Sequence, residues 1–171
     1  MVEATRRLFI LRHGKSDWNT GQADFDRPLA DRGRSGAQKV GAWMKDERLI
    51  PDQVISSPAR RARETAEAVC RALGIKERAI YFDERIYGGS VAEMLTSLAE
   101  HAGNARQVLL VGHNPGLEDL VYFLTHGPLT QPDDGKLLPT AALAVLRPLN
   151  DWRSLGQGAA ELLSITRPGE M

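Results

Sequence analysis

Two short runs of consecutive apolar residues constrain the fold of this chain most strongly. One run, 8–11 in an expected strand at 7–11, is followed directly by Arg12-His13-Gly14. The other, 108–111 in an expected strand at 107–111, is followed by Gly112-His113-Asn114-Pro115. A strand that is apolar at every position is typical of a sheet that is covered on both faces, and such sheets are mostly parallel. The runs therefore predict an α/β protein, whose ligands bind outside the carboxyl ends of the strands.

Strand and helix patterns alternate along the rest of the chain. We expect strands at 7–11, 53–56, 79–82, 107–111, 141–146 and 160–166. Helices are expected over 31–48, 58–73, 91–98 and 117–124. Pro58 is the expected first residue of the second helix, and Gly74 ends it. Ser90 and Glu93 are expected to form a capping box at the start of the third helix.

The alternation predicts a three-layer α/β/α fold with a mostly parallel central sheet and helices on both faces. The last two strands have no helix between them, so we expect one antiparallel strand and a turn at Asn150-Asp151. Residues 127–139 carry three prolines and two aspartates and are expected to form a mobile surface loop. No repeat or linker interrupts residues 1–171, which we expect to form a single domain.

Composition argues against several classes of protein. The 22 basic and 22 acidic residues give a net charge of zero, which does not favour nucleic acid or an anionic membrane as a partner. The single cysteine, Cys70, excludes an intramolecular disulfide and fits a reducing compartment. With no signal-like start and no apolar run near the ~20 residues of a membrane helix, a cytoplasmic protein is expected.

Three segments that follow predicted strands carry the residues for an anion site. Both histidine motifs end strands, so their imidazoles are expected to face each other across one pocket. The third segment, Ser56-Ser57-Pro58 with Arg60 and Arg61, follows the strand at 53–56. Arginines at a helix start bring forked donors to an anion, and the free helix amides add partial positive charge.

Together these motifs resemble the histidine phosphatase superfamily, which includes phosphoglycerate mutases and the SixA-type phosphohistidine phosphatases. The family's Arg-His-Gly signature matches Arg12, His13 and Gly14, its second arginine motif matches Arg61-Ala62 with Thr65, and its second histidine matches His113. Further matches are Ser16, Trp18 and Asn19, and, for the small SixA-like branch, Asp26-Arg27-Pro28-Leu29 with Arg32-Gly33. The resemblance covers nearly the whole chain and implies a phosphoglycerate mutase-like fold.

The resemblance implies roles for individual residues. His13 would be the nucleophile that becomes phosphorylated, with Arg12, Arg61 and His113 binding the phosphate and Asn19 contributing less. Adjacent cations disfavour a protonated imidazole, so they would keep His13 neutral and also stabilise the transferring oxygens. The arginines would supply the charge that magnesium supplies elsewhere, so no metal or cofactor is expected.

The proton donor for the leaving group is less well defined. Glu84 is the main candidate, because the segment Glu84–Gly88 resembles the mutase segment that carries the acid; Asp17 and Asp26 are lesser candidates, and no acid at all is a further alternative. Glu84 could equally be a solvated loop residue and Asn19 a loop cap. Arg60 is a rival to Arg61. His101 and His126, near predicted helix ends, are expected at the surface.

Other phosphate chemistries fit the sequence poorly. Gly14-Lys15-Ser16 resembles the end of a P-loop, but Phe9 stands where that motif needs a glycine. A cysteine phosphatase loop would need an arginine six residues after Cys70, where Lys76 stands. No histidine pair has the spacing of a zinc-binding helix, so no metal site is expected.

The resemblance therefore predicts a metal-independent phosphatase that acts through a phosphohistidine on His13, with protein phosphohistidine as the expected substrate. A phosphomonoesterase for a small phosphorylated metabolite is the second hypothesis. An idle module that only binds phosphorylated partners is the third. The sequence leaves the oligomeric state open.

Overall fold

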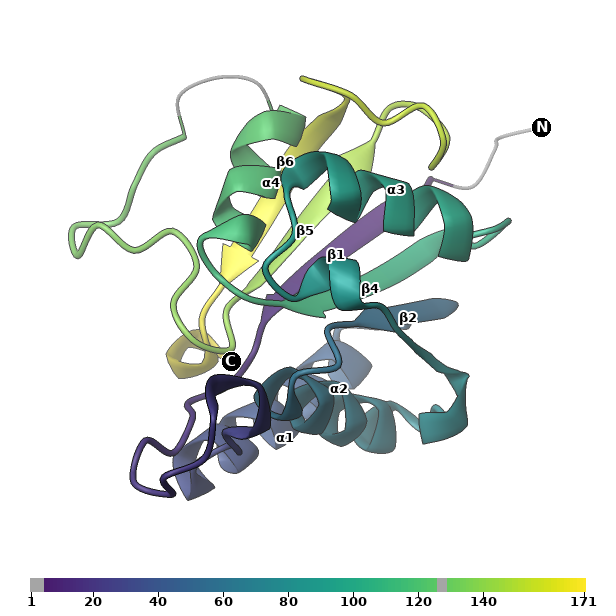
Figure 1. Ribbon diagram of the computed structural model, residues 1–171. Helices are drawn as coiled ribbons and strands as arrows, with labels where there is room; N and C mark the ends of the chain where they lie inside the picture. Colours follow the sequence, from purple (N-terminus) through teal and green to yellow (C-terminus); the bar gives the residue numbers. More distant parts are fainter. Residues whose placement is uncertain (1–4, 126–128) are drawn as a thin grey trace.

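A computed structural model describes residues 5–125 and 129–171 and shows one mixed sheet between two layers of helices (Figure 1). The strand order is β3-β2-β4-β1-β5-β6. The strands are β1 (Arg7–Arg12), β2 (Gln53–Ser56), β3 (Ile80–Phe82), β4 (Gln107–Gly112), β5 (Leu143–Pro148) and β6 (Ala160–Thr166). β1, β2, β3 and β4 pair in parallel, whereas β5 runs antiparallel to both of its neighbours, as predicted.

The four α-helices of the described residues cover both faces of the sheet, which confirms the three-layer α/β/α prediction (Figure 1). They are α1 (Asp31–Asp46), α2 (Arg60–Leu73), α3 (Val91–His101) and α4 (Gly116–Thr125). Short 3₁₀ turns lie at Asp24–Asp26, Glu77–Ala79, Glu84–Ile86 and Pro168–Glu170. None of the described helices combines the length and the apolar character needed to span a bilayer.

Strand β1 shows why its four central residues, Leu8–Leu11, are all apolar. Phe9 and Leu11 are fully buried in the cluster that α1 and α2 form, whereas Leu8 and Ile10 are fully buried with residues of α3 and α4 on the other face. A strand between two helical layers has no solvent-facing side, so the usual alternation of polar and apolar residues disappears.

Two local predictions at helix ends are confirmed. Gly74 ends α2 with φ 75°, a left-handed conformation that glycine adopts readily. Ser90 and Glu93 form the expected capping box at the start of α3. The prediction for Pro58 is wrong, because α2 begins two residues later at Arg60; the Ser57 Oγ accepts a hydrogen bond from the amide of Ala59 instead.

The last third of the chain differs most from its prediction. β5 starts at Leu143 rather than residue 141, because Ala141 has φ 59° and donates its amide to the carbonyls of Arg12 and His13. The connection to β6 spans 149–159 instead of a tight turn at Asn150-Asp151. Of the predicted surface loop, 127–128 lie outside the described residues, as does His126, whereas Leu137 and Leu138 are buried in the core.

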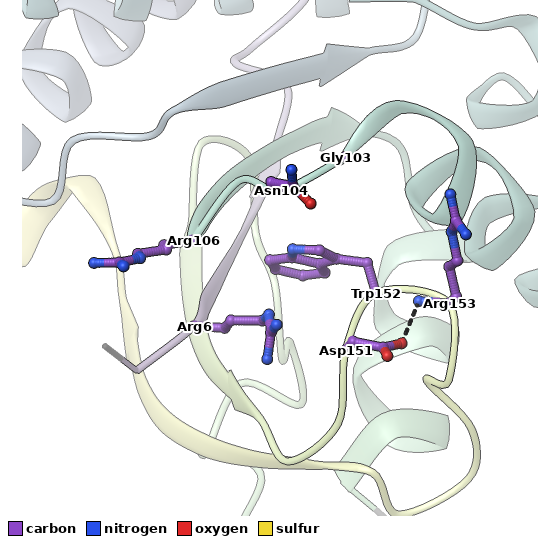
Figure 2. Close-up of a pocket in the computed structure, with 7 residues that line it drawn as sticks. All are labelled: Arg6, Gly103, Asn104, Arg106, Asp151, Trp152 and Arg153. Atoms are coloured by element: carbon purple, nitrogen blue, oxygen red, sulfur yellow. Dashed lines mark hydrogen bonds between the residues drawn. The ribbon is translucent and has the colours of Figure 1, made fainter. Parts of the chain in front are cut away.

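At the amino ends of β1 and β4 the sheet is closed by Trp152, which is 3% exposed. Its indole Nε1 donates a hydrogen bond of 2.6 Å to the carbonyl of Ala105. The indole lies in a hollow of about 450 Å³ that is also lined by Arg6, Arg106 and Arg153 (Figure 2). The predicted histidine motifs lie at the other end of both strands.

Candidate active site

The carboxyl ends of β1 and β4 place the two histidine motifs side by side. Arg12 and Gly112 are partners in the parallel register, so His13 and His113 follow at the same level of the sheet. The amide of His13 donates to the carbonyl of Gly112 at 3.0 Å, and the two imidazole centroids are 5.1 Å apart. The prediction that these rings face one pocket is confirmed.

The two rings line a cavity of about 240 Å³. Of the predicted site residues, Arg12, His13, Arg61 and His113 are brought together here. The remaining lining residues are Lys15, Ser16, Trp18, Arg27, Asn114 and Thr140. Four of these ten lining residues are cations and none of the ten is an acid, which suits an anionic ligand.

The imidazole of His13 is held in a defined orientation. It is buried, and its Nδ1 lies 2.7 Å from the carbonyl oxygen of Gly14. A carbonyl can only accept, so Nδ1 carries the proton of the neutral ring and Nε2 keeps its lone pair. Burial lowers the pKa of His13 to about 4, and the positive charges of Arg61, Arg12 and Arg27 add to this, against the opposing hydrogen bond to Gly14.

His113 is also held as a neutral imidazole. Its Nε2 lies 2.7 Å from the Ser57 Oγ, at the end of β2. Burial, together with the neighbouring His13 and Arg61, lowers the pKa of His113 to about 3. Among the described residues, the buried Nδ1 of His113 has no hydrogen-bond partner.

Arg61, rather than its rival Arg60, reaches the cavity. Arg61 is only 6% exposed and lines the cavity, whereas Arg60 lies outside it and faces Glu64 at 3.7 Å. The guanidinium of Arg61 donates to the backbone carbonyl of Asp24 at 2.6 Å and to its Oδ2 at 3.1 Å. Its Nε is buried and unpartnered within the described part of the chain, so donors remain for a ligand.

The turn after His13 is fixed by close backbone contacts. The amide of Gly14 donates to the Thr65 Oγ1 at 3.0 Å, and this hydroxyl donates to the carbonyl of Arg61 at 2.7 Å. At the start of α1, a Cβ added to Gly33 would lie 2.0 Å from the carbonyl oxygen of Lys15. Only glycine allows this approach, which explains the position of Gly33 opposite the turn.

The wall opposite α2 is held by α4 and the loop before β5. Arg12 donates from one guanidinium nitrogen to the carbonyl of Leu138 at 3.1 Å. The Asn114 side-chain amide donates to the same carbonyl at 2.8 Å and to Glu118 Oε1 at 3.1 Å. Asn114 and Glu118 therefore orient this wall, a role that their positions in the sequence did not indicate.

The other predicted candidates lie outside this cavity. Asn19 is exposed and does not line the cavity. Its backbone amide donates to the Asp17 carboxylate at 2.9 Å, so the side chain that caps this turn is that of Asp17 and not that of Asn19. Glu84 and Asp26 are exposed and Asp17 is half-buried, and none of the three lines the cavity. The structure therefore does not bring a predicted proton donor to His13.

Asp24 and Tyr87 join the site through contacts that sequence reasoning missed. The Asp24 carboxylate accepts from Arg27 at 2.7 Å, from Arg61 at 3.1 Å and from the Tyr87 hydroxyl at 2.6 Å. The Tyr87 ring lies edge-on to His113, with 5.5 Å between centroids. Ser57 and Arg27 were also missed as site residues, although both lie within the motifs that indicated the site.

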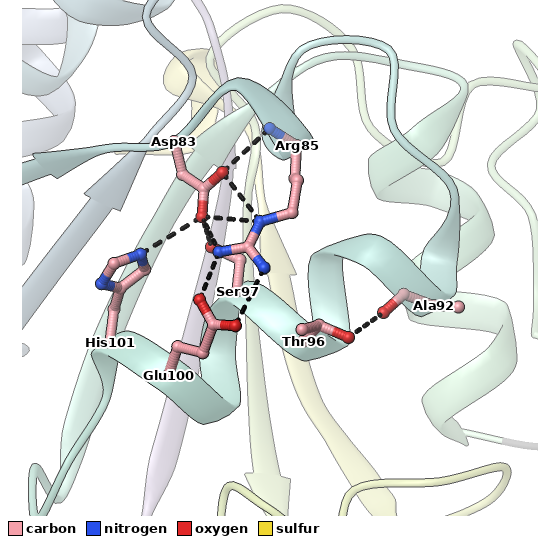
Figure 3. A network of polar contacts seen from close by, with 7 residues as sticks. All are labelled: Asp83, Arg85, Ala92, Thr96, Ser97, Glu100 and His101. Atoms are coloured by element: carbon pink, nitrogen blue, oxygen red, sulfur yellow. Dashed lines mark hydrogen bonds and ion pairs between the residues drawn. The ribbon is translucent and has the colours of Figure 1, made fainter.

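The segment that carries Tyr87 is anchored by the nearby carboxylate of Asp83, which is 8% exposed (Figure 3). It accepts hydrogen bonds from the Arg85 side chain and from the Ser97 hydroxyl at 2.6 Å. His101 also reaches it, with Nε2 at 3.2 Å, so this histidine at the end of α3 is half-buried and has a defined hydrogen-bond partner. Arg85 and Ser97 hold the pKa of Asp83 well below its usual range.

No group of three or more His, Cys, Asp or Glu side chains within residues 5–125 and 129–171 is arranged to hold a metal ion. Cys70 is buried within α2, and burial raises the pKa of its thiol to about 12, which leaves it without thiolate character. The chemistry of the cavity therefore belongs to two neutral imidazoles and several cations. The fold and the cavity define an α/β protein with a cation-lined cavity, suited to a small anion, beside two neutral histidines.

Comparisons with known proteins agree with this class. The family model of the histidine phosphatase superfamily (branch 1) matches residues 8–88. A crystal structure named as a candidate SixA phosphohistidine phosphatase from Agrobacterium tumefaciens is 31% identical, with TM-score 0.75 over 95% of this chain and 98% of that one. A similarly named structure from Nakamurella multipartitia is 28% identical, with TM-score 0.82 over 97% and 98%.

An uncharacterized protein of Mycobacterium tuberculosis is 33% identical over 92% of this chain and 99% of its own length. The chain belongs to the histidine phosphatase superfamily, and within it to the SixA-type branch. It is therefore a phosphatase, as its motifs predicted.

Proposed function

We propose that this phosphatase removes the phosphoryl group from protein phosphohistidine through a covalent intermediate on His13. The observation that carries the proposal is the His13 imidazole. Its proton is held on Nδ1 by the Gly14 carbonyl, and its pKa of about 4 keeps the ring neutral at pH 7. A neutral, oriented imidazole beside Arg12 and Arg61 has what nucleophilic attack on a phosphoryl group requires.

The reaction proceeds in two transfers. The lone pair of His13 Nε2 forms a bond to phosphorus while the bond to the substrate nitrogen breaks and its electron pair stays on the substrate. Water then attacks the same phosphorus, His13 regains its lone pair, and inorganic phosphate leaves. Arg12, Arg61 and His113 hold the phosphoryl oxygens in both steps, because preorganised positive charge stabilises the transition state.

The absence of carboxylic acids from the described cavity lining favours a phosphorus–nitrogen substrate. A phosphorylated imidazole that carries a proton on its other nitrogen leaves as a neutral ring. An ordinary phosphate ester leaves as an alkoxide and needs a proton from an acid. The proposal therefore assigns no proton donor to Glu84, Asp17 or Asp26.

The size of the cavity supports a phosphoryl group presented by a macromolecule. At about 240 Å³ it is below the ~300–1,000 Å³ typical of pockets that enclose small molecules. Trp18 at its edge is 73% exposed, so the surroundings of the cavity are open. The two SixA-type neighbours, named as candidate phosphohistidine phosphatases, agree with this substrate.

The test compares phosphate release from a histidine-phosphorylated protein by the wild type, His13→Ala and His101→Ala. His101 is a matched control, since it lies at the end of α3 and does not line the cavity. We expect at least ~100-fold loss for His13→Ala and near-normal activity for His101→Ala. A quenched reaction should trap an acid-labile phosphoryl group on His13.

Near-normal turnover by His13→Ala, or a label on another residue, would refute the covalent mechanism. Faster turnover of small phosphomonoesters would favour the metabolite phosphatase. Binding of the phosphoprotein without release of phosphate would contradict the proposal and support the hypothesis of a module that only binds phosphorylated partners.

A further inference from the structure

The carboxylate of Asp24 places a negative charge beside a cavity that, by the proposed function, binds a negatively charged phosphoryl group. It bonds to the guanidinium groups of Arg27 and Arg61, both of which line the cavity. Its own side chain is 53% exposed, so it lies at the edge of the cavity next to solvent. The proposed reaction assigns no step to this carboxylate.

The position of this carboxylate is fixed by aromatic contacts. The Tyr87 hydroxyl donates to it at 2.6 Å, and the Tyr87 ring lies 5.5 Å from that of His113. Phe25, the next residue, packs edge-on against Tyr87 with 5.2 Å between centroids. Asp24 therefore keeps a constant position relative to His113.

Asp24 stays ionised at neutral pH. The hydrogen bond from Tyr87 and the charges of Arg27 and Arg61 hold the pKa of Asp24 well below its usual range. It therefore acts as a fixed negative charge and not as a proton donor.

A fixed negative charge at this place distinguishes ligands by the charge of the group that is attached to the phosphoryl group. A phosphoryl group on the remaining donors of Arg61 has the guanidinium between itself and the carboxylate, and its repulsion is common to all substrates. A further negative charge roughly 6 Å from the carboxylate weakens binding by about threefold to tenfold in a solvent-exposed site. A ligand whose attached group is neutral or cationic does not have this loss of binding affinity.

We propose that Asp24 is a specificity-determining residue. It disfavours phosphoryl compounds in which the group attached to the phosphoryl carries a further negative charge, and so selects neutral or cationic attached groups such as a protein imidazole. The inference rests on the proposed function, because it takes the cavity to hold a phosphoryl group. It adds a reason for the enzyme to discriminate against acidic phosphorylated metabolites, many of which carry a carboxylate or a second phosphate.

Binding of a matched ligand pair tests this proposal without turnover. Phosphoglycolate and phosphoglycolamide differ in one negative charge on the leaving group and are otherwise alike. Their dissociation constants would be measured by titration calorimetry at low salt on His13→Ala protein, with and without Asp24→Asn. We expect Asp24→Asn to shift the ratio of the two constants about threefold to tenfold in favour of phosphoglycolate.

Glu161→Gln in the His13→Ala background is the matched control. It removes the same formal charge from an exposed ion pair with Arg147 at the β5–β6 edge, and we expect it to leave the ratio within twofold. A merely structural role of Asp24 would weaken both ligands equally.

The proposal is overturned if Asp24→Asn leaves the ratio within twofold, if Glu161→Gln shifts it equally, or if neither ligand binds. The proposed function is tested separately. It would be contradicted if His13→Ala, in otherwise wild-type protein, still released phosphate at a near-normal rate.

Discussion

At the scale of single residues, Arg61 shows how the cavity reserves positive charge for a ligand. One side of its guanidinium is held by Asp24, while its buried Nε is unpartnered among the described residues. Because the fork is held from one side, its remaining donors keep their direction before a phosphoryl group arrives. Such preorganisation lowers the free energy that would otherwise be lost in orienting the side chain.

Replacing this arginine should therefore be costly. We expect Arg61→Ala to lower kcat/KM for phosphohistidine protein by at least ~100-fold, because charged donors to transition-state oxygens contribute several kcal/mol. Arg60→Ala, one position earlier and outside the cavity, should remain within about threefold. Steady-state kinetics of both variants checks this, and a larger loss for Arg60→Ala would contradict the assignment of Arg61.

The two active-site histidines should also mark the response to acid. Their pKa values of about 4 and about 3 lie below the ordinary 6.5, so both rings stay neutral from pH 8 down to about 5. Between pH 6.5 and 4 the unfolded chain binds protons that the folded chain does not. Stability is therefore highest above pH 6.5 and falls as the pH drops through this window.

Ring ¹⁵N resonances measured from pH 8 to 3.5 would test this directly. Protonation of His13 should begin only below about pH 5. A midpoint near 6.5 for either ring would contradict the buried, cation-flanked environment seen in the structure. Urea unfolding of the wild type and His13→Gln at pH 7 and 5 would show whether the substitution reduces the pH dependence.

At the scale of elements, α1 and the turn after β1 depend on one close backbone approach. A methyl group on Gly33 would lie 2.0 Å from the Lys15 carbonyl oxygen, so the turn or the helix has to move. The turn carries Gly14, whose carbonyl fixes the tautomer of His13. Packing of α1 is therefore connected to the chemistry of the site.

We expect Gly33→Ala to destabilise the protein by about 1–3 kcal/mol and to lower activity, because overpacked backbone cannot relax without displacing the turn. Gly36→Ala is the matched control in the same helix. Its Cβ would meet only the Ala141 Cβ at 3.9 Å, so it should be neutral or stabilising by up to ~1 kcal/mol. Urea unfolding with a kinetic assay distinguishes the two, and equal behaviour would contradict the close-approach argument.

At the scale of the whole molecule, the cavity joins segments that are far apart in the chain. Arg12 and His13 follow β1, Ser57 follows β2, and His113 follows β4, while Leu138 comes from the loop before β5. No single segment can bind phosphate alone. A ligand in the cavity therefore stabilises the contacts between these segments and, with them, the whole fold.

Inorganic phosphate at about 100 times its dissociation constant should raise the free energy of unfolding by roughly 2.7 kcal/mol. Denaturant unfolding with phosphate, and with chloride at equal ionic strength, measures the effect. His113→Ala should reduce it strongly, because one of the two facing imidazoles is lost. An equal increase with chloride would show a general salt effect instead.

The sequence by itself predicted the layers of the fold, the strands that carry His13 and His113, and the meeting of both histidine motifs at one cavity. These features follow from local patterns: apolar runs report burial on both faces, and parallel strands bring their carboxyl ends to one edge. The choice of Arg61 over Arg60 came instead from the resemblance to the histidine phosphatase superfamily. The capping box at Ser90 and the stop at Gly74 are likewise local.

The tertiary structure alone decided which loop residues meet at the cavity. Asp24 and Tyr87 are 63 positions apart, and Arg12 and Leu138 are 126 apart, so no periodicity connects them. The predicted acid Glu84 lies outside the cavity, while the unpredicted Asp24 lies at its edge. Such loop contacts depend on how the loops pack on the folded core. The charges around the cavity are therefore a property of the tertiary structure and not of any local sequence pattern.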